Sequence, residues 1–398
     1  MGEVWREHPS FELVEQASEV TGRDVARLLL AADQETLTRT DNSQLATFVL
    51  SLVVLDAAER VGLEPGALAG HSLGEYSALV ASGALDFEDG LRLVAERGSA
   101  MQQASEDSPG TMAAVLGLED DAVESACGLA EGDVWVANYN APGQVVIAGT
   151  HDAVAEAGRI AKDLGGRRVL PLPVGGAFHT PLMSPARDRL RKALAEVAFR
   201  APEPAVVANV DARHHDGADE WHRLLSAQLC SPVRWRQSLD TLFESAANTL
   251  VEIGPGNVLT GLARRVLPGD AVAVSVSTPD DLDRLIEMLA GHSPAVQAAA
   301  EARTGERFHI FERLVLSPAA GLFEPDPSVT SLIPGAGRGT RQPVTVEVGG
   351  LIGLVGSTEV RSAFEGSLEG VLVLPGERVT TGQPVAWLRA AASEAAAK

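Results

Sequence analysis

The spacing of apolar residues predicts mostly helix over residues 1–104. The clearest segment is LATFVLSLVVLDAAERVG, residues 45–62, whose helical pattern stops at a glycine. The residues that follow, EPGALAGHS, predict a turn and a short strand, and GEYSALVASGAL then returns to helical spacing. Ser72 therefore lies where a short strand turns abruptly into a helix.

The pattern changes between residues 111 and 174, where strands alternate with helices. The predicted order is strand, helix, strand, strand, helix, strand, which is the ferredoxin-like unit. Its six segments are TMAAVLG, EDDAVESACGLA, VWVANYN, QVVIAG, HDAVAEAGRIAKDLG and RRVLPLPV. We predict residues 109–174 as a ferredoxin-like subdomain inserted in an α/β core that comprises residues 1–108 and 175–290.

Beyond this subdomain the pattern indicates a return to the core and then a second kind of domain. HTPLMSPARDRLRKALAEV predicts a helix, and NTLVEIGPGNVLTGLARRV predicts a strand, a Gly-Pro-Gly turn and a helix. Residues 291–305 predict a linker. Residues 306–391 are rich in strands and in Gly and Pro turns, which predicts a separate all-β domain, and residues 392–398 predict a tail.

Composition narrows the class of protein. The 398 residues are 45% hydrophobic and 22% charged, which is typical of globular proteins with several domains. The sequence has neither a membrane-span-length apolar run nor an N-terminal signal segment, so we expect a cytoplasmic location. The net charge of −22 argues against nucleic acid or an acidic membrane as the main partner. Cys127 and Cys230 show no metal-ligand or disulfide spacing, so we expect no metal site.

Candidate chemistry begins at Gly70-His71-Ser72-Leu73-Gly74, a G-x-S-x-G sequence. A strand-to-helix turn exposes the serine hydroxyl, and the following helix N-terminus favours negative charge, as a nucleophile elbow requires. A serine at such a turn can also be an ordinary helix N-cap. The motif alone leaves both interpretations open.

Seven stretches, taken in order, extend the motif to most of the chain: TRTDNSQLA, AGHSLGEYSALVASGAL, RLVAERGSAMQ, NYNAPGQVVIAG, GGAFHTPLM, AQLCSPVRW and VEIGPGNVLTGL. Together they resemble the malonyl-CoA:acyl carrier protein transacylase family over roughly residues 1–290. The resemblance implies an α/β-hydrolase-like acyltransferase core that carries a ferredoxin-like subdomain.

The resemblance also implies a reaction. A malonyl group passes from malonyl-CoA to the phosphopantetheine thiol of an acyl carrier protein, for fatty acid or polyketide synthesis, through an ester on Ser72. A serine hydroxyl needs a base within reach, and His179 matches the family's base. In the family, a backbone carbonyl orients that histidine, and the matching residue here is Gln228. No part is assigned to the Gln228 side chain. The N–H of Leu73 would stabilise the oxyanion, and no bound cofactor is expected.

Arg97 distinguishes this interpretation from a plain esterase. A guanidinium binds a carboxylate such as that of malonyl through two parallel hydrogen bonds. The residues three and four positions away on the predicted helix are Leu93, Val94, Ala100 and Met101, which include no carboxylate. Arg97 therefore lies on an apolar face, as a buried charge that awaits a partner would.

Other matches refine the expected substrate site. In related polyketide acyltransferases, patterns like Leu73 after the serine and Phe178 before the histidine accompany malonyl, whereas glutamine after the serine and an A-S-H ending accompany methylmalonyl. His71 and Asn140 match family positions near the active site. We place both among the candidate substrate-binding residues, with Arg97 and Phe178.

The N-terminal end departs from the family pattern. The family opens with a short apolar strand and a G-Q-G-S-Q loop, whereas the first residues here match those that follow that loop. The loop supplies the second backbone N–H of the oxyanion hole, and losing one such donor costs about 10²–10³ in rate. We therefore expect the natural protein to be longer and this chain, as it stands, to be impaired.

The C-terminal part departs as well. Residues 306–391 resemble the biotinyl/lipoyl carrier domain, which holds its cofactor on a lysine at a hairpin tip. The matching stretch here is GLVGSTEVRS, and the lysines of the chain are Lys162, Lys192 and Lys398. We expect neither biotin nor lipoate, and we predict an interaction or stabilising module.

Two questions about function stay open. Arg167 and Arg168 form a basic island that would suit docking of an acidic carrier protein, while most such clusters are solvated loop ends. An acyl-thioester hydrolase would use the same serine and histidine, and a catalytically impaired transacylase-fold adaptor would explain the missing loop. The oligomeric state is left open.

Overall fold

The computed structural model describes residues 1–245, 247–267, 269, 271–290, 312–332, 344–347, 349–362, 366–380 and 383–390. The chain divides into two compact units, one made of Met1–Glu59 and Leu63–Leu285 and the other of Arg60–Gly62 and Ile286–Lys398. The predicted linker, residues 291–305, and the predicted tail, residues 392–398, lie outside the described residues. No helix in the described ranges is long and apolar enough to cross a membrane.

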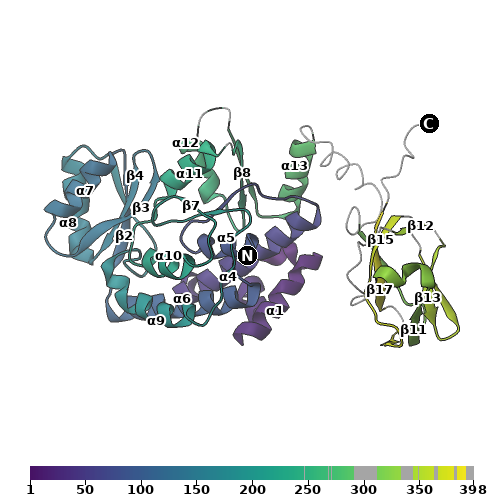
Figure 1. Ribbon diagram of the computed structural model, residues 1–398. Coiled ribbons are helices and arrows are strands. Elements are labelled where there is room, and N and C mark those ends of the chain that lie inside the picture. Colours follow the sequence, from purple (N-terminus) through teal and green to yellow (C-terminus); the bar gives the residue numbers. More distant parts are fainter. Residues whose placement is uncertain are drawn as a thin grey trace. The chain divides into compact units, whose positions relative to one another are not determined.

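The first unit opens with helices, as the apolar spacing predicts (Figure 1). Two short 3₁₀ helices, Glu3–Trp5 and Pro9–Phe11, precede α1 (Glu12–Thr21), α2 (Val25–Leu30), α3 (Gln34–Thr38) and α4 (Thr40–Arg60). After the short strand β1 (Leu68–Ala69) come α5 (Gly74–Ala81) and α6 (Phe87–Asp107). The apolar side chains of α4 are almost all buried, from Leu45 to Ala58.

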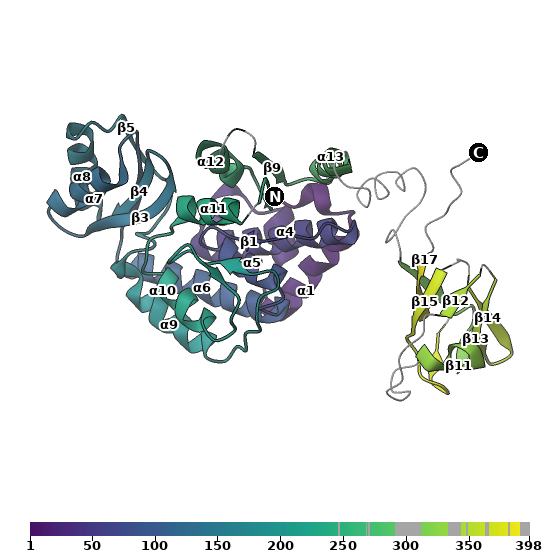
Figure 2. The ribbon, with the colours of Figure 1, turned by 45° about the horizontal axis from the view of Figure 1, so that its top comes forward.

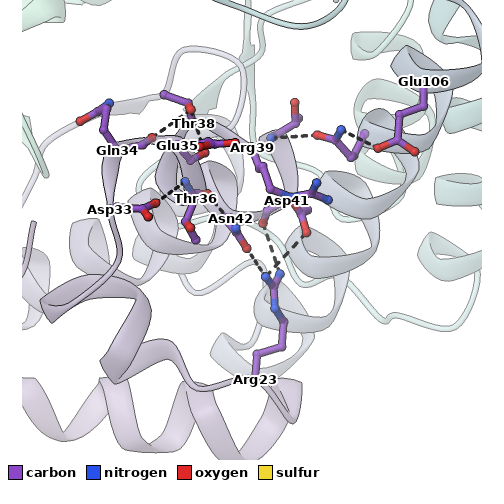
Figure 3. A network of polar contacts seen from close by, with 12 residues as sticks. Arg23, Asp33, Gln34, Glu35, Thr36, Thr38, Arg39, Asp41, Asn42 and Glu106 are labelled. Atoms are coloured by element: carbon purple, nitrogen blue, oxygen red, sulfur yellow. Dashed lines mark hydrogen bonds and ion pairs between the residues drawn. The ribbon is translucent and has the colours of Figure 1, made fainter.

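Polar contacts fix the first turn of α4 (Figure 3). Arg23 donates to the carbonyl of Asp41 at 3.4 Å and to Oδ1 of Asn42, and it lies 3.7 Å from the Asp41 carboxylate. The N–H of Thr40 donates to Oε1 of Gln102 on α6 at 3.1 Å. A Cβ on Gly98 would lie 3.0 Å from Cα of Asp41, so the glycine permits α6 to approach this turn closely. These contacts set the position of α4 against α6.

The remaining elements of the core follow the inserted segment in sequence (Figure 2). Strand β1 pairs in parallel with β6 (Val206–Val207), and β6 pairs antiparallel with β7 (His214–His215). Strands β8 (Thr249–Ile253) and β9 (Val272–Val276) form a separate parallel pair. The helices of this part are α9 (Ser184–Leu194), α10 (Trp221–Gln228), α11 (Trp235–Glu244), α12 (Val258–Val266) and α13 (Pro279–Ala290), with a 3₁₀ turn at Pro181–Met183.

The inserted segment has the predicted element order. It consists of β2 (Thr111–Leu116), α7 (Asp120–Leu129), β3 (Val134–Ala141), β4 (Gln144–Gly149), α8 (His151–Asp163) and β5 (Arg168–Pro171). The strands form one antiparallel sheet in the order β3-β4-β2-β5. The residues of β2 alternate between two cores: Ala113 and Val115 pack with α7 and α8, whereas Met112 and Ala114 pack on the opposite face with Phe178. That second face therefore supports the residue next to His179.

The second unit is rich in β structure. One sheet has the order β10-β17-β15-β12 and the other β14-β13-β11-β16, and both contribute to a single hydrophobic core. The strands are β10 (Glu312–Leu316), β11 (Gly321–Pro325), β12 (Val344–Val346), β13 (Leu351–Val355), β14 (Thr358–Arg361), β15 (Gly366–Val371), β16 (Arg378–Val379) and β17 (Pro384–Ala390), with a 3₁₀ segment at Pro327–Leu332. The hairpin of β13 and β14 turns at Gly356 and Ser357, within the stretch GLVGSTEVRS.

The turn before α5 leaves no room for a side chain at Gly70. A Cβ there would lie 1.9 Å from the backbone carbon and oxygen of Gly74 and 2.5 Å from the nitrogen of Glu75. Because those are backbone atoms, Gly70→Ala should lower the free energy of unfolding by about 3 kcal/mol. Gly74→Ala is the matched control, since its Cβ would meet nothing within 4 Å. Urea unfolding of both variants tests this, and equal losses would contradict it.

Candidate active site

Ser72 occupies a strained turn between β1 and α5. Its φ of +53° lies in the left-handed region that only a few per cent of non-glycine residues adopt. Its N–H donates to Oδ1 of Asn209 at 2.7 Å, and the Asn209 amide nitrogen donates to the carbonyl of Gly70 at 2.7 Å. Strain of this kind persists when surrounding contacts impose it, and it is common where a nucleophile is presented.

His179 lies against the serine, in the loop before α9. Its Nε2 is 2.7 Å from Oγ of Ser72, and its Nδ1 is 2.9 Å from the backbone carbonyl of Gln228. A carbonyl only accepts, so Nδ1 carries the proton and Nε2 is left to accept the serine hydroxyl hydrogen. The residue is buried and has a φ of +61°. The pair has the geometry of a nucleophile and its general base.

Burial and a neighbouring cation keep the His179 imidazole neutral. Burial, followed by the positive charge of Arg97, lowers the pKa of His179 to about 3. An imidazole with that pKa is neutral throughout the neutral range, so its Nε2 lone pair is free to accept the hydroxyl hydrogen of Ser72. The base is therefore ready without any prior deprotonation.

Arg97 of α6 is a buried cation beside the nucleophile. Its side chain is 1% exposed. Nη1 donates to Oε1 of Gln44 at 2.5 Å, and Nη2 donates to Oε1 of Gln228 at 2.9 Å and to Oγ of Ser72 at 3.0 Å. Within the described part of the chain, no carboxylate oxygen lies within ion-pair distance of it, and its buried Nε has no hydrogen-bond partner. Burial lowers the pKa of Arg97, but a guanidinium stays charged in a protein.

The side chain of Gln228, at the end of α10, joins these groups. Its Nε2 donates to the carbonyl of Ser72 at 2.8 Å and to Oε2 of Glu75 at 2.5 Å, while its Oε1 accepts from Arg97. From the sequence, only the backbone carbonyl of this residue is expected to have a part in the site. The side chain in fact makes further hydrogen bonds, to the nucleophile's turn, to a carboxylate, to the guanidinium and, at 3.5 Å, to Oδ1 of Asn209.

Sequence reasoning missed three residues of the site: Gln44, Glu75 and Asn209. Two of them lie inside the family-like stretches, Gln44 in TRTDNSQLA and Glu75 in AGHSLGEYSALVASGAL. The acidic side chain of Glu75 among small and apolar neighbours was a signal of a buried polar group. Glu75 is fully buried, and burial raises its pKa to about 7. Asn209 follows β6 and carried no comparable local signal.

The other predicted residues lie around this centre or away from it. His71 and Asn140 hydrogen-bond to each other, with Nε2 and Oδ1 3.0 Å apart. Phe178 precedes His179 and packs on the inserted sheet. Leu73 begins the turn into α5, and among the described contacts its backbone N–H has no acceptor. The structure therefore brings His71 and Asn140 together as one pair.

The two basic candidates for docking are exposed. Arg167 precedes β5 and Arg168 begins it, on the inserted sheet. In the same described ranges, no group of three or more His, Cys, Asp or Glu residues could hold a metal ion.

The neutral state of His179 has a direct spectroscopic consequence. With a pKa of about 3, the imidazole should keep the chemical shifts of a neutral ring between about pH 8 and pH 5, whereas an ordinary histidine titrates near 6.5. Histidine-labelled protein followed by NMR measures this, and His179→Asn assigns the signal by removing it. A midpoint near 6.5 for that signal would show that burial does not control the base.

Comparison with known proteins shows the family to which the chain belongs. Residues 11–280 match the family model described as acyl transferase domain. The malonyl CoA-acyl carrier protein transacylase of Escherichia coli K12 is 40% identical over 286 residues, which cover 70% of this chain and 92% of that protein. The crystal structure of an acyl carrier protein S-malonyltransferase from Vibrio cholerae is 42% identical, with a TM-score of 0.67 over 69% of this chain and 91% of that one.

A further match is the structure of a type II PKS acyl-carrier protein in complex with its malonyl-transacylase. It is 37% identical, with a TM-score of 0.67 over 70% of this chain and 91% of that one. The serine turn, the histidine and the buried arginine all lie inside the residues that the family model matches. The chain therefore belongs to the acyl transferase domain family, among the malonyl CoA-acyl carrier protein transacylases.

Proposed function

We propose that this chain transfers a malonyl group from malonyl-CoA to the phosphopantetheine thiol of an acyl carrier protein, through an ester on Ser72. The observation that carries the proposal is Arg97, a buried guanidinium that contacts the nucleophile's hydroxyl and has only neutral oxygen partners. A buried charge with no opposite charge in direct contact is costly. A substrate carboxylate would supply that charge, and a neutral acyl group would not.

Each proton in the reaction has a place to go. Ser72 Oγ attacks the thioester carbonyl while His179 Nε2 takes the hydroxyl proton, and the N–H of Leu73 donates to the developing oxyanion. The carbon–sulfur bond then breaks, and the imidazolium protonates the leaving CoA sulfur. In the second half, the carrier thiol loses its proton to His179 and attacks the ester. Ser72 recovers the proton as the malonyl thioester leaves.

The buried arginine also accounts for selectivity in this proposal. Arg97 would bind the malonyl carboxylate through two hydrogen bonds, each stronger than a neutral one because both partners are charged. His71, Asn140 and Phe178 lie near this centre in the sequence or in the fold, and we assign them to the walls of the substrate site. The product would serve fatty acid or polyketide extension. A cytoplasmic location remains a prediction.

The second unit has a separate proposed role. Two four-stranded sheets around one core, with a tight hairpin at Gly356 and Ser357, support a barrel-sandwich relative of the biotinyl/lipoyl domains. The hairpin has no lysine, so we propose that the unit carries neither biotin nor lipoate and acts in interaction or stability. An added biotinyl or lipoyl mass on the protein as isolated from its cell would refute this.

Intact mass after brief incubation with malonyl-CoA tests the chemistry. We expect a malonyl adduct on the unmodified chain and none on Ser72→Ala. Arg97→Ala should slow malonylation about 10- to 100-fold and affect acetylation from acetyl-CoA far less, because a hydrogen bond between charged groups contributes about 1.5–3 kcal/mol. Arg92→Ala is the matched control, since Arg92 lies on the same helix, α6, and pairs with exposed Glu88 and half-buried Asp89.

The same experiment separates the alternatives. A malonyl adduct that water removes as fast with or without carrier protein would indicate a thioester hydrolase. An adduct that forms only when the G-Q-G-S-Q loop is restored would support the transferase chemistry and show that the loop is needed. Absence of any adduct in this chain and in the loop-restored version, with both proteins folded, would favour the adaptor and contradict the transferase.

Docking of the carrier protein is proposed at Arg167 and Arg168. Both are exposed on the inserted subdomain, and a positive pair would attract an acidic carrier despite the net charge of −22. Reversing both charges to Glu should raise the KM for carrier protein several-fold and leave the KM for malonyl-CoA unchanged. Arg27→Glu, at an exposed position of α2, is the control. Unchanged steady-state kinetics with the carrier would place docking elsewhere.

A further inference from the structure

Glu75 is a fully buried carboxylate that the proposed reaction does not use. It lies in the first turn of α5, three residues after the nucleophile, and is 0% exposed. Its Oε1 accepts the backbone N–H of Asn209 at 2.9 Å, and its Oε2 accepts Nε2 of Gln228 at 2.5 Å. Both partners are donors, so each oxygen is matched to a donor it can accept from.

These contacts allow only one orientation of the Gln228 amide. The amide nitrogen has two hydrogens, which go to the Ser72 carbonyl and to Glu75, and the amide oxygen accepts from Arg97. Reversing the amide would set its oxygen against two acceptors and its nitrogen against a guanidinium donor. Every reversed contact is repulsive, so Glu75 holds Gln228 with its oxygen toward Arg97.

The arrangement also aligns charges. The amide of Gln228 places its positive end on the Glu75 carboxylate and its negative end on the Arg97 guanidinium. Two buried opposite charges are therefore linked through one neutral side chain instead of a direct ion pair. A direct pair would occupy the guanidinium, whereas this link keeps Arg97 oriented and leaves its charge for a ligand.

We propose that Glu75 is a positioning residue for malonyl transfer, which acts through the Gln228 amide to hold the guanidinium of Arg97 where it receives the substrate carboxylate. The inference rests on the proposed role of Arg97 in binding malonyl. It assigns Glu75 no proton transfer and no contact with substrate.

The substitution Glu75→Gln isolates this role because it retains size and replaces one acceptor with a donor. The backbone N–H of Asn209 cannot rotate away, so the new side chain must turn its oxygen toward Asn209 and its amide nitrogen toward Gln228. Gln228 then has to reverse or move, and Arg97 loses one of its acceptors, Oε1 of Gln228. The first effect should be on a substrate that needs the guanidinium.

The experiment compares two reactions of Ser72 at about pH 8, above the pKa of about 7 of Glu75. One is malonylation by malonyl-CoA, and the other is labelling by a small neutral fluorophosphonate, which needs the nucleophile and base but no carboxylate partner. In Glu75→Gln we expect malonylation to slow at least about tenfold and labelling to slow less than about threefold, by the loss of one hydrogen bond to a charged group. Proportional losses, or none, would overturn the proposal.

A matched control exists elsewhere in the same unit. Glu252 accepts the N–H groups of Leu259 and Thr260 at the start of α12, at 3.1 and 2.7 Å. Glu252→Gln likewise sets a side-chain amide nitrogen against a backbone N–H donor, but at a place that Gln228 does not contact. The ratio of the malonylation rate to the labelling rate should therefore equal that of the unmodified protein. A fall in the ratio as large as that of Glu75→Gln would assign the effect to general loss of stability and overturn the proposal.

The pathway through Gln228 is tested by Gln228→Met, which keeps the volume and removes the amide. We expect this variant alone to lower the ratio of malonylation to labelling. Adding Glu75→Gln to Gln228→Met should lower the ratio little further, because the effects of coupled residues are not additive. If Glu75→Gln fails to fold, the single Gln228→Met variant carries the test, and an unchanged ratio would overturn the proposal. Malonylation by the unmodified chain is measured first, so failure of the proposed function is recognised separately.

Discussion

One residue, Gln228, connects the groups on which the site depends. Its peptide carbonyl sets the tautomer of His179, and its side chain reaches the turn of Ser72, the carboxylate of Glu75 and the guanidinium of Arg97. The end of α10 therefore fixes base, nucleophile and cation relative to one another. Because each bond uses a different donor or acceptor of the same residue, displacing α10 would disturb all of them together.

Exclusion of water has opposite effects on two neighbouring side chains. It keeps the His179 imidazole neutral, so its Nε2 lone pair is free to accept a proton, and it leaves the charge of Arg97 without an anion in direct contact. The cation in turn reinforces the neutrality of the base. The same apolar environment therefore keeps the proton acceptor neutral and favours binding of an anionic acyl group at Arg97. A solvated site would have neither effect.

The sequence predicted the helical N-terminal part, the order of elements over residues 111–174 and the positions of Ser72, His179 and Arg97, because local spacing and family motifs carry that information. It could not place Glu75, Asn209 and the Gln228 side chain in one cluster. The hydrogen bonds that join this cluster connect residues more than 130 positions apart in the sequence, except for the bond between Asn209 and Gln228, which are 19 positions apart. Such hydrogen bonds depend on how α5, α10 and the loop after β6 pack, which no local periodicity encodes. The domain boundaries and the roles of the site residues stay predictions.

The two amides that hold Arg97 have an evolutionary consequence. Replacing Arg97 alone to accept a neutral acyl group would leave the buried oxygens of Gln44 and Gln228 without a donor, and each unsatisfied buried acceptor costs about 1–3 kcal/mol. Specificity in this site is therefore epistatic: a viable route to another acyl group passes through compensating changes on α4 or α10 before the arginine itself changes. Lineages that retain both glutamines would be expected to retain preference for an acidic acyl group, even where the rest of the cleft diverges.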